Sequence, residues 1–519
     1  VAVVHNGIIE NYKPLKGELI AGGATFTSDT DTEVIAHLFT HYLDSGADIK
    51  SAAQATFAKL EGAYALGLII SGHDDVMIAS RHGSPLAIGY GQGATYIGSD
   101  AFALAPFTNR ITYLEDGDWA LLYNDRVEIF DKSGTPQSRP TQTIDVATAM
   151  VDKGQYRHFM AKEIHEQPEV LSRSVGQYVD ADNGCVILPE NTPDYGDIDK
   201  VYLVACGTAY FAAQIARHWV ERYAGLSAEI DIASEFRYRP IPLGQRSLAV
   251  FISQSGETAD TLAALAKCKA AGIATLGVVN VPDSSITREV DITFPTYAGA
   301  EIGVASTKAF LAQMVALAAL AIGLGRMKGA ITPAQESGLV ARLLSTPRLA
   351  NMVLAQEDKI AALARKIADY KGVLFIGRGL MWAMALEGAL KLKELSYIHA
   401  EGFPAGELKH GSIALIDETM PVIALAPSTN EHKVLFDKTI LNMQEIMARG
   451  GQVVLVSDEA GLAAAGEDCM GHIALPEVDD LTAPIVYAIP MQLLAYYAAV
   501  AKGTDVDQPR NLAKSVTVE

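Results

Sequence analysis

The stretch SLAVFISQSGETADTLAALAKCKAAG, residues 247–272, joins an apolar run to an Ala-rich run through a short polar turn. Its first six residues are almost all apolar, as in a strand whose two faces are both covered, and the Ala-rich run has the length of a helix. Strands that alternate with helices in this way form parallel sheets. The stretch therefore predicts an α/β domain of the doubly wound type.

The same alternation occurs twice in the second part of the chain. One set of strands, KVYLVA, SLAVFIS and ATLGVV, begins at residue 200, and a second set, GVLFIG, MPVIAL and QVVLVSD, begins at residue 372. The first two strands of each set start 47 or 48 residues apart. This repeat indicates two similar doubly wound domains, in which ligands bind beyond the carboxyl ends of the strands.

The beginning of the chain has a different pattern. Short strand-like runs such as YALGLII, DVMIAS and ATYIGSD predominate, and two amphipathic helical stretches interrupt them. One runs from Asn11 to about Ala21, and the other begins at TDTEVIAHLF, where Thr30 or Asp31 can cap it. The pattern predicts an α+β domain.

The predicted organisation has five parts. An α+β domain is followed by a polar connection that leads into a helix, then by two doubly wound domains and a C-terminal tail without a hydrophobic period. The boundaries are 1–142, 143–190, 191–340, 341–503 and 504–519.

Composition narrows the classes of function. The 519 residues include 61 acidic and 41 basic side chains, and the net charge of −20 would repel nucleic acid. The four cysteines show neither disulfide nor zinc-ligand spacing, which fits a reducing, cytoplasmic compartment. Two apolar stretches from Ala309 and Leu481 are predicted to be buried core helices, because one contains Gln and the other contains two prolines.

The turn SQSGET predicts an anion site. It brings Ser253, Gln254, Ser255 and Thr258 to the start of a helix, where free N–H groups and the helix dipole favour negative charge. Helix capping alone would account for one of the three hydroxyls. We therefore predict a phosphate site that needs no Lys or Arg.

Two other strand-to-helix turns follow predicted strands. In CGTAY, Gly207 and Thr208 are predicted ligand contacts at the edge of the same sheet. The turn GRGLMW does not predict a dinucleotide site, because Trp382 stands where the third glycine would be needed.

The helical stretch ALEGALKLKELS carries Glu387, Lys391 and Glu394 on one face. A solvated ladder of ion pairs is the ordinary explanation for such a stripe. Its other faces are Ala and Leu, however, so the helix is predicted to be buried, and buried charges must be paired or functional.

Two further residues have open alternatives. His410 lies in a Gly-flanked loop and is a candidate acid or base, although a structural histidine is nearly as good an explanation. Lys514 lies in the tail, where it is either an ordinary surface lysine of a frayed terminus or, if the tail covers a pocket, an amine that forms a Schiff base.

Motifs along nearly the whole chain resemble the glutamine:fructose-6-phosphate amidotransferases, also called glucosamine-6-phosphate synthases. The motifs are HNGIIEN, TDTEVIAH, RHGSPLAIG, ACGTAY, ASEFRYR, SQSGETADT, EIGVASTKAF, ALEGALKLKE, SYIHAE, GELKHG and KGTDVDQPRNLAKSVTVE. The resemblance implies an N-terminal-nucleophile glutaminase domain followed by two sugar-isomerase (SIS) domains. It implies transfer of ammonia from glutamine to fructose 6-phosphate and isomerisation to glucosamine 6-phosphate, the first step of hexosamine synthesis.

The resemblance also implies roles for individual residues. Asn6 and Gly7 match the oxyanion hole, and Asp31 matches the carboxylate that holds the α-amino group of glutamine. Glu394 matches the group that moves a proton between C1 and C2, with His410 assisting ring opening. The remaining matches are Lys514 as the Schiff-base lysine, Glu387 and Lys391 as site residues near Glu394, Val304 and Ser306 as sugar contacts, and Ser253, Gln254, Ser255 and Thr258 as phosphate contacts.

The resemblance implies no metal or organic cofactor, and it implies a cytoplasmic homodimer formed through the SIS domains. One departure concerns the glutaminase half. Family members begin with a nucleophilic Cys some tens of residues before HNG, whereas Val1 opens this chain and its first cysteine is Cys185. We therefore expect that an N-terminal segment is missing from this chain, and that the chain as given does not hydrolyse glutamine.

Two alternatives follow. One is a glutaminase-dead isomerase or an ammonia-dependent synthase, and the other is a non-catalytic sugar-phosphate sensor built on SIS domains. A sensor would need the phosphate site but not Glu394, His410 and Lys514 together.

Overall fold

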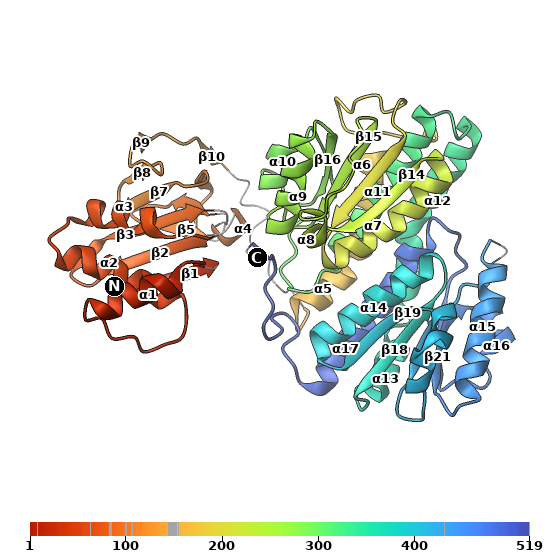
Figure 1. Cartoon of the computed structure of the whole chain (residues 1–519). Coiled ribbons are helices and arrows are strands. Elements are labelled where there is room, and N and C mark those ends of the chain that lie inside the picture. The colour runs from red at the N-terminus through yellow and green to blue at the C-terminus, as the bar shows by residue number, and fades with distance from the viewer. Residues whose placement is uncertain are drawn as a thin grey trace. The chain divides into compact units, whose positions relative to one another are not determined.

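The computed structural model describes most of the chain as two compact units (Figure 1). The first unit comprises Val1–Asp152 with the short segments Glu257–Asp260 and Ser515–Glu519, and the second comprises Lys153–Gly256 and Thr261–Lys514. The residues outside the description are 8, 63, 83–85, 99–100, 105–106, 144–152, 154, 430 and 518–519, together with the side chains of 101–102. Part of the motif RHGSPLAIG and residues 144–152 and 154 of the predicted polar connection therefore lie outside the described residues.

The first unit is an α+β fold with one layer of helices and two sheets. The strands form an antiparallel six-stranded sheet and a second, four-stranded sheet. The orders are β1 (Ala2–Gly7), β2 (Tyr64–Ile70), β3 (His73–His82), β7 (Trp119–Tyr123), β8 (Val127–Phe130), β9 (Pro136–Gln137) in the first, and β10 (Thr141–Thr143), β6 (Arg110–Tyr113), β4 (Ala87–Tyr90), β5 (Thr95–Gly98) in the second.

Alternation along β2 explains this layering. Leu66 and Leu68 share a core with the three longer helices α1 (Tyr12–Ala21), α2 (Thr32–Asp44) and α3 (Ile49–Lys59). Ala65, on the opposite face of the strand, belongs to a core cluster with Leu86 and Ile88 at the second sheet. A short helix, α4 (Ala101–Leu104), completes the unit.

The sequence predicted only two helices here, and the presence of α3 shows that this prediction was wrong. The helix buries mainly small side chains, Ala52 and Ala53, together with Phe57 near its end. Its start is fixed by Asp48, whose carboxylate accepts a hydrogen bond from the Ser51 N–H at 2.7 Å. A run of Ala, Ser and Thr has a weak apolar period, so this helix depends on its cap and on its packing.

The second unit confirms the predicted pair of doubly wound domains. Each domain has a parallel five-stranded sheet, and in both sheets the first strand in sequence lies between the second and the third. The orders are β14 (Ser227–Ile232), β13 (Lys200–Ala205), β15 (Ser247–Ser253), β16 (Ala274–Val279), β17 (Ile292–Pro295), and β19 (His399–Pro404), β18 (Gly372–Gly377), β20 (Val422–Leu425), β21 (Val453–Asp458), β22 (Gly471–Leu475).

Helices cover both faces of each sheet (Figure 1). One large core joins the two sheets through α7 (Gly207–Trp219), α11 (Lys308–Met327), α14 (Leu380–Ser396) and α17 (Ala483–Lys502). The other helices and short strands of the unit are α5 (Phe159–His165), α6 (Gln167–Tyr178), β11 (Val179–Asp180), β12 (Cys185–Val186), η2 (Val220–Ala224), α8 (Ala233–Phe236), α9 (Ala259–Ala270), α10 (Ser285–Glu289), α12 (Pro333–Leu354), α13 (Glu357–Ile367), η3 (Ala405–His410), η4 (Ser412–Leu415), α15 (Lys433–Met447) and α16 (Glu459–Ala465).

The two most apolar helices are core helices, as predicted. Both α11 and α17 are long and apolar enough to cross a membrane by length and composition. In the fold, 100% of the apolar window of α11 and 89% of that of α17 are buried. Their side chains pack in the core that joins the two sheets.

Glycine at the end of β18 is required by close packing, which gives a stability prediction. A Cβ on Gly377 would lie 2.2 Å from the main-chain oxygen of Met381, so Gly377→Ala should destabilise by about 1–3 kcal/mol or more. Gly338→Ala is the matched control, because its Cβ would meet nothing within 4 Å on α12 and should stabilise by about 0.5–1 kcal/mol. Differential scanning calorimetry should show the unfolding transition of this unit moving down for the first variant and up for the second. Equal transitions would contradict the packing described for β18.

Candidate active site

The loop after β15 has a fixed shape at the carboxyl edge of the first parallel sheet. Gly256 has φ of 71°, and a Cβ there would lie 2.0 Å from Ser284 Oγ, so only glycine fits. Its N–H donates to Ser253 Oγ at 2.9 Å, and its carbonyl accepts from the Ile286 N–H at 3.0 Å. Gln254 and Ser255 are half-buried beside this turn. The loop therefore presents polar side chains just before α9, and their role as phosphate contacts stays a prediction.

The turn after β13 reaches the helix that carries the predicted charged face. Gly207 begins α7 with φ of 56°, and no atom lies within 4 Å of the position of its missing Cβ. The Thr208 hydroxyl donates to Glu387 Oε1 at 3.3 Å. A residue of the first doubly wound domain is thus in contact with α14 of the second.

Lys391 lies between two carboxyl groups on α14, as the spacing predicted. Its Nζ is 2.7 Å from Glu394 Oε2 and 3.7 Å from Glu387 Oε1. The Lys391 and Glu387 side chains are each 1% exposed, whereas that of Glu394 is 21% exposed. The expectation of a buried face in place of a solvated ladder is confirmed.

Burial gives the two outer carboxyl groups of this set different environments. Burial raises the pKa of Glu387 to about 8, although the charge of Lys391 opposes the shift. For Lys391, burial alone would lower the pKa, but Glu394 and Glu387 outweigh it and the pKa is raised. The set therefore holds one ammonium paired with the carboxylate of Glu394, while Glu387 keeps its proton near neutral pH. Of the two carboxyl groups, that of Glu394 is the more exposed.

The C-terminal tail is anchored, and the alternative of a frayed terminus was wrong. The Asp507 carboxylate accepts hydrogen bonds from the N–H groups of Phe159 and Met160, each at 3.0 Å, at the start of α5. The Arg510 N–H donates to the Tyr397 hydroxyl at 2.9 Å, just beyond the end of α14. These contacts hold the tail across the fold before it reaches Lys514.

Lys514 is paired with a buried carboxylate. Its Nζ donates to Glu301 Oε2 at 2.6 Å and to the Gly303 carbonyl at 2.8 Å. The Lys514 side chain is 24% exposed, whereas that of Glu301 is fully buried. Burial would raise the pKa of Glu301, but Lys514 and the N–H groups of Thr307 and Ala309 outweigh it and the pKa is lowered. Lys514 is thus a held amine with access to solvent, unlike an ordinary surface lysine.

The loop that holds Lys514 also contains the two predicted sugar contacts. Val304 is half-buried, and its N–H donates to the Asp507 carbonyl at 3.0 Å. Ser306 precedes α11, and its Oγ is buried without a hydrogen-bond partner among the described residues. A buried hydroxyl without a partner is uncommon and is available to a ligand.

His410 is a predicted sugar-site residue on the second doubly wound domain. It ends η3 and is exposed. Within the described part of the chain, none of its hydrogen bonds or ion pairs reaches Glu394 or Lys514.

In the first unit, the predicted glutamine-site residues gather at the end of β1. Asn6 is exposed there, and Gly7 has φ of 137°. The carboxylate of Asp31 accepts from the Ile9 N–H at 2.8 Å. Asp31 occupies the N-cap position of α2 but makes no capping hydrogen bond, so its predicted role as a cap was wrong. Its carboxylate instead holds the backbone that follows the HNG motif.

Sequence reasoning missed two carboxyl groups of the Lys514 site, Glu301 and Glu163. Glu301 had a usable signal, because it is the single charge within the small and apolar run AGAEIGVAS. Glu163 had none, since the polar stretch MAKEIHEQ does not reveal which charge is buried. In the structure Glu163 Oε1 accepts from the N–H groups of Ile302 and Gly303, at 2.6 and 3.1 Å.

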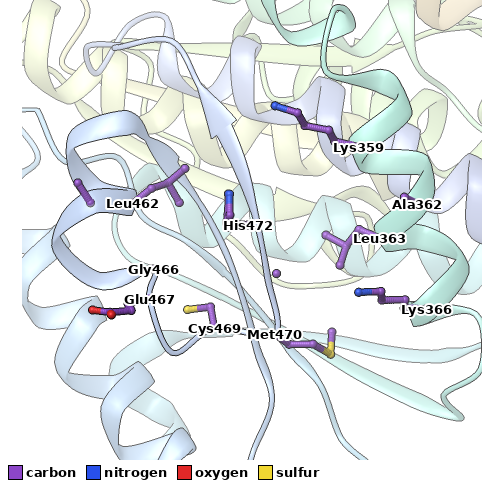
Figure 2. A pocket seen from close by; sticks show the side chains of 12 residues that line it. Lys359, Ala362, Leu363, Lys366, Leu462, Gly466, Glu467, Cys469, Met470 and His472 are labelled. Atoms are coloured by element: carbon purple, nitrogen blue, oxygen red, sulfur yellow. The ribbon is translucent and has the colours of Figure 1, made fainter.

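A cavity of about 850 Å³ in the second doubly wound domain lies apart from the predicted residues (Figure 2). Lys359 and Lys366 of α13 face residues of α16 and β22 across it, and its polar lining also includes Glu467, Cys469 and His472. Burial raises the pKa of the Cys469 thiol to about 11, so it is not a ready nucleophile. None of the predicted site residues lines this cavity.

Comparison with known families matches both halves of the fold. The SIS domain matches residues 196–323 and 366–502, and the glutamine amidotransferase domain matches residues 1–106. A glutamine–fructose-6-phosphate aminotransferase (isomerizing) of Rhizobium meliloti is 54% identical over 520 residues, and one of Zymomonas mobilis is 53% identical over 519. Each alignment covers 100% of this chain and 85% of the relative.

A solved structure supports the assignment of the second unit. The C-terminal domain of glucosamine-fructose-6-phosphate aminotransferase from Francisella tularensis is 43% identical, with a TM-score of 0.66. It covers 69% of this chain and 100% of its own length. With matches over the whole chain and both families of domain in place, the chain belongs to the glutamine–fructose-6-phosphate aminotransferases (isomerizing).

Proposed function

We propose that this chain converts fructose 6-phosphate and ammonia to glucosamine 6-phosphate, the synthase step of the glutamine–fructose-6-phosphate aminotransferases. The observation that carries the proposal is the pair of lysine–carboxylate sets, Lys514 with Glu301 and Lys391 with Glu394. Glu301 also raises the pKa of Lys391, so the two sets share one electrostatic environment. An amine that can form an imine and a carboxylate that can move a proton are the two groups that this conversion requires.

The proposed roles of the site residues in the reaction are as follows. Ser253, Gln254, Ser255 and Thr258 bind the phosphate, with Gly207 and Thr208 at the neighbouring turn. The Lys514 amine attacks C2 of the open-chain ketose, and water leaves to give an imine. Ammonia then displaces the lysine, and Glu394 takes a proton from C1 and returns one to C2.

Other residues support these steps. Lys391 holds Glu394 in place at 2.7 Å, and Glu387 holds Lys391 from the other side. Val304 and Ser306 contact the sugar, and His410 assists opening of the ring. Asn6 and Gly7 stabilise the tetrahedral intermediate of amide hydrolysis, while Asp31 binds the α-amino group of glutamine.

We also propose that the chain acts as a cytoplasmic homodimer formed through its SIS domains. Exposed apolar side chains on η4 and α15 support a surface for self-association, because Leu415, Val434 and Leu441 are between 49% and 70% exposed. All four cysteines are free thiols, which supports a reducing compartment.

Lys514→Ala tests the imine. Borohydride reduction in the presence of fructose 6-phosphate should attach the sugar to Lys514 in the unchanged chain, and the variant should give no adduct. Lys359→Ala is the matched control, because it removes an exposed lysine from the cavity of Figure 2 and should leave the yield unchanged. An adduct of full yield in Lys514→Ala would contradict the proposed imine at this lysine.

Glu394→Gln tests the proton transfer and separates a synthase from a sensor. With fructose 6-phosphate and ammonium, the unchanged chain should form amino sugar, and the variant should be slower by about 10²–10⁴-fold in kcat. The imine adduct on Lys514 should still form, because the amine is intact. Binding without turnover in the unchanged chain, with either ammonium or glutamine, would favour the sensor.

Ser255→Ala tests the phosphate loop. Losing one hydrogen bond to a charged phosphate should raise the KM for fructose 6-phosphate by about 10-fold or more, with a smaller change in kcat. Ser337→Ala on the exposed side of α12 is the control and should leave both constants unchanged. A KM that stays constant in Ser255→Ala would place the phosphate elsewhere.

A further inference from the structure

We propose that Glu163 is a positioning residue for Lys514, which holds the loop 301–304 in place around the amine. The inference rests on the proposed imine at Lys514 and adds a residue on α5 to that site. Glu163 does not touch the substrate, because it acts through the loop.

The hydrogen bonds of Glu163 fix the part of the chain that holds the amine. Its Oε1 accepts from the N–H groups of Ile302 and Gly303 at 2.6 and 3.1 Å. The same short segment contacts Lys514. Glu301 Oε2 lies 2.6 Å and the Gly303 carbonyl oxygen 2.8 Å from Lys514 Nζ. A shift of Glu163 would therefore move both acceptors of the amine.

The second oxygen of Glu163 is packed against the same loop. Glu163 is 1% exposed, and its Oε2 is buried without a hydrogen-bond partner among the described residues. A Cβ on Gly303 would lie 2.9 Å from this oxygen, so glycine permits the close approach. A buried carboxylate oxygen without a donor is costly, and a proton on it removes most of that cost.

The charges around Glu163 explain the state of its carboxyl group. Glu301 and Lys514 are the charged groups that act on it. Glu301 already pairs with Lys514, so a second carboxylate would leave excess negative charge in a buried place. Burial and the neighbouring Glu301 raise the pKa of Glu163 to about 7.

Glu163→Gln keeps an oxygen that can accept both loop N–H groups. We expect the yield of borohydride trapping of fructose 6-phosphate on Lys514, and the KM, to stay within about twofold of the unchanged chain. Glu163→Ala removes the acceptor and should lower the yield about tenfold or more. Mass spectrometry of the Lys514 peptide measures both yields.

Glu336→Gln is the matched control, because Glu336 is also a buried carboxylate that accepts a backbone hydrogen bond, from the Val186 N–H at 2.9 Å. Its yield should equal that of the unchanged chain. If Glu163→Gln does not fold, Glu163→Asp serves instead, since a shorter side chain keeps the charge, withdraws from the loop and should lower the yield.

The outcomes separate the two levels of the proposal. No adduct on Lys514 in the unchanged chain overturns the proposed imine and the role of Glu163 together. An adduct of unchanged yield in Glu163→Ala overturns the role of Glu163 alone, as does an unchanged yield in Glu163→Asp.

Discussion

The ion pair between Lys514 and Glu301 is the contact on which the sugar site depends. The tail that carries Lys514 has no helix or strand over its described residues 504–517, so a few polar contacts determine where it lies. Glu301 is fully buried and needs a cation to remain ionised, and Lys514 supplies it. The amine that completes this pair is also the proposed nucleophile. Attachment of the tail and formation of the imine therefore compete for one lysine.

The second constraint is the burial of Lys391. An ammonium 1% exposed is tolerable only with a carboxylate close by, and Glu394 provides it at 2.7 Å. Glu387, one turn earlier on the helix, contacts Lys391 as well. It also accepts a hydrogen bond from the Thr208 hydroxyl of the other SIS domain. Packing on α14 thus joins this helix to the turn after β13 in the other SIS domain, and the proposed general base, Glu394, is held on a rigid helix.

The parts of the fold that could be predicted are those with a continuous apolar run. The central strands β13, β15, β18 and β21 are buried on both faces, and their sequences showed it. The outer strand β14 is mostly half-exposed, so it lacks that pattern and was not foreseen. Helix α3 was missed because small residues gave a weak period.

The same distinction between local and long-range patterns applies to the residues of the candidate site. Residues in ordered local motifs, such as Ser255 and Lys391, could be found from spacing and chemistry. Glu163 could not, because its burial arises only when α5 packs beside the loop at Gly303. The anchoring of the tail by Asp507 also depends on residues more than 300 positions away in the sequence. Such long-range pairings carry no local signal.

A crystal structure of the chain with fructose 6-phosphate tests the central claim most directly. The account predicts the phosphate in the loop 253–258 and C2 of the sugar within bonding distance of Lys514 Nζ, with Glu394 beside C1 and C2. A sugar phosphate bound in the cavity between α13, α16 and β22, with Lys514 still paired to Glu301, would contradict it.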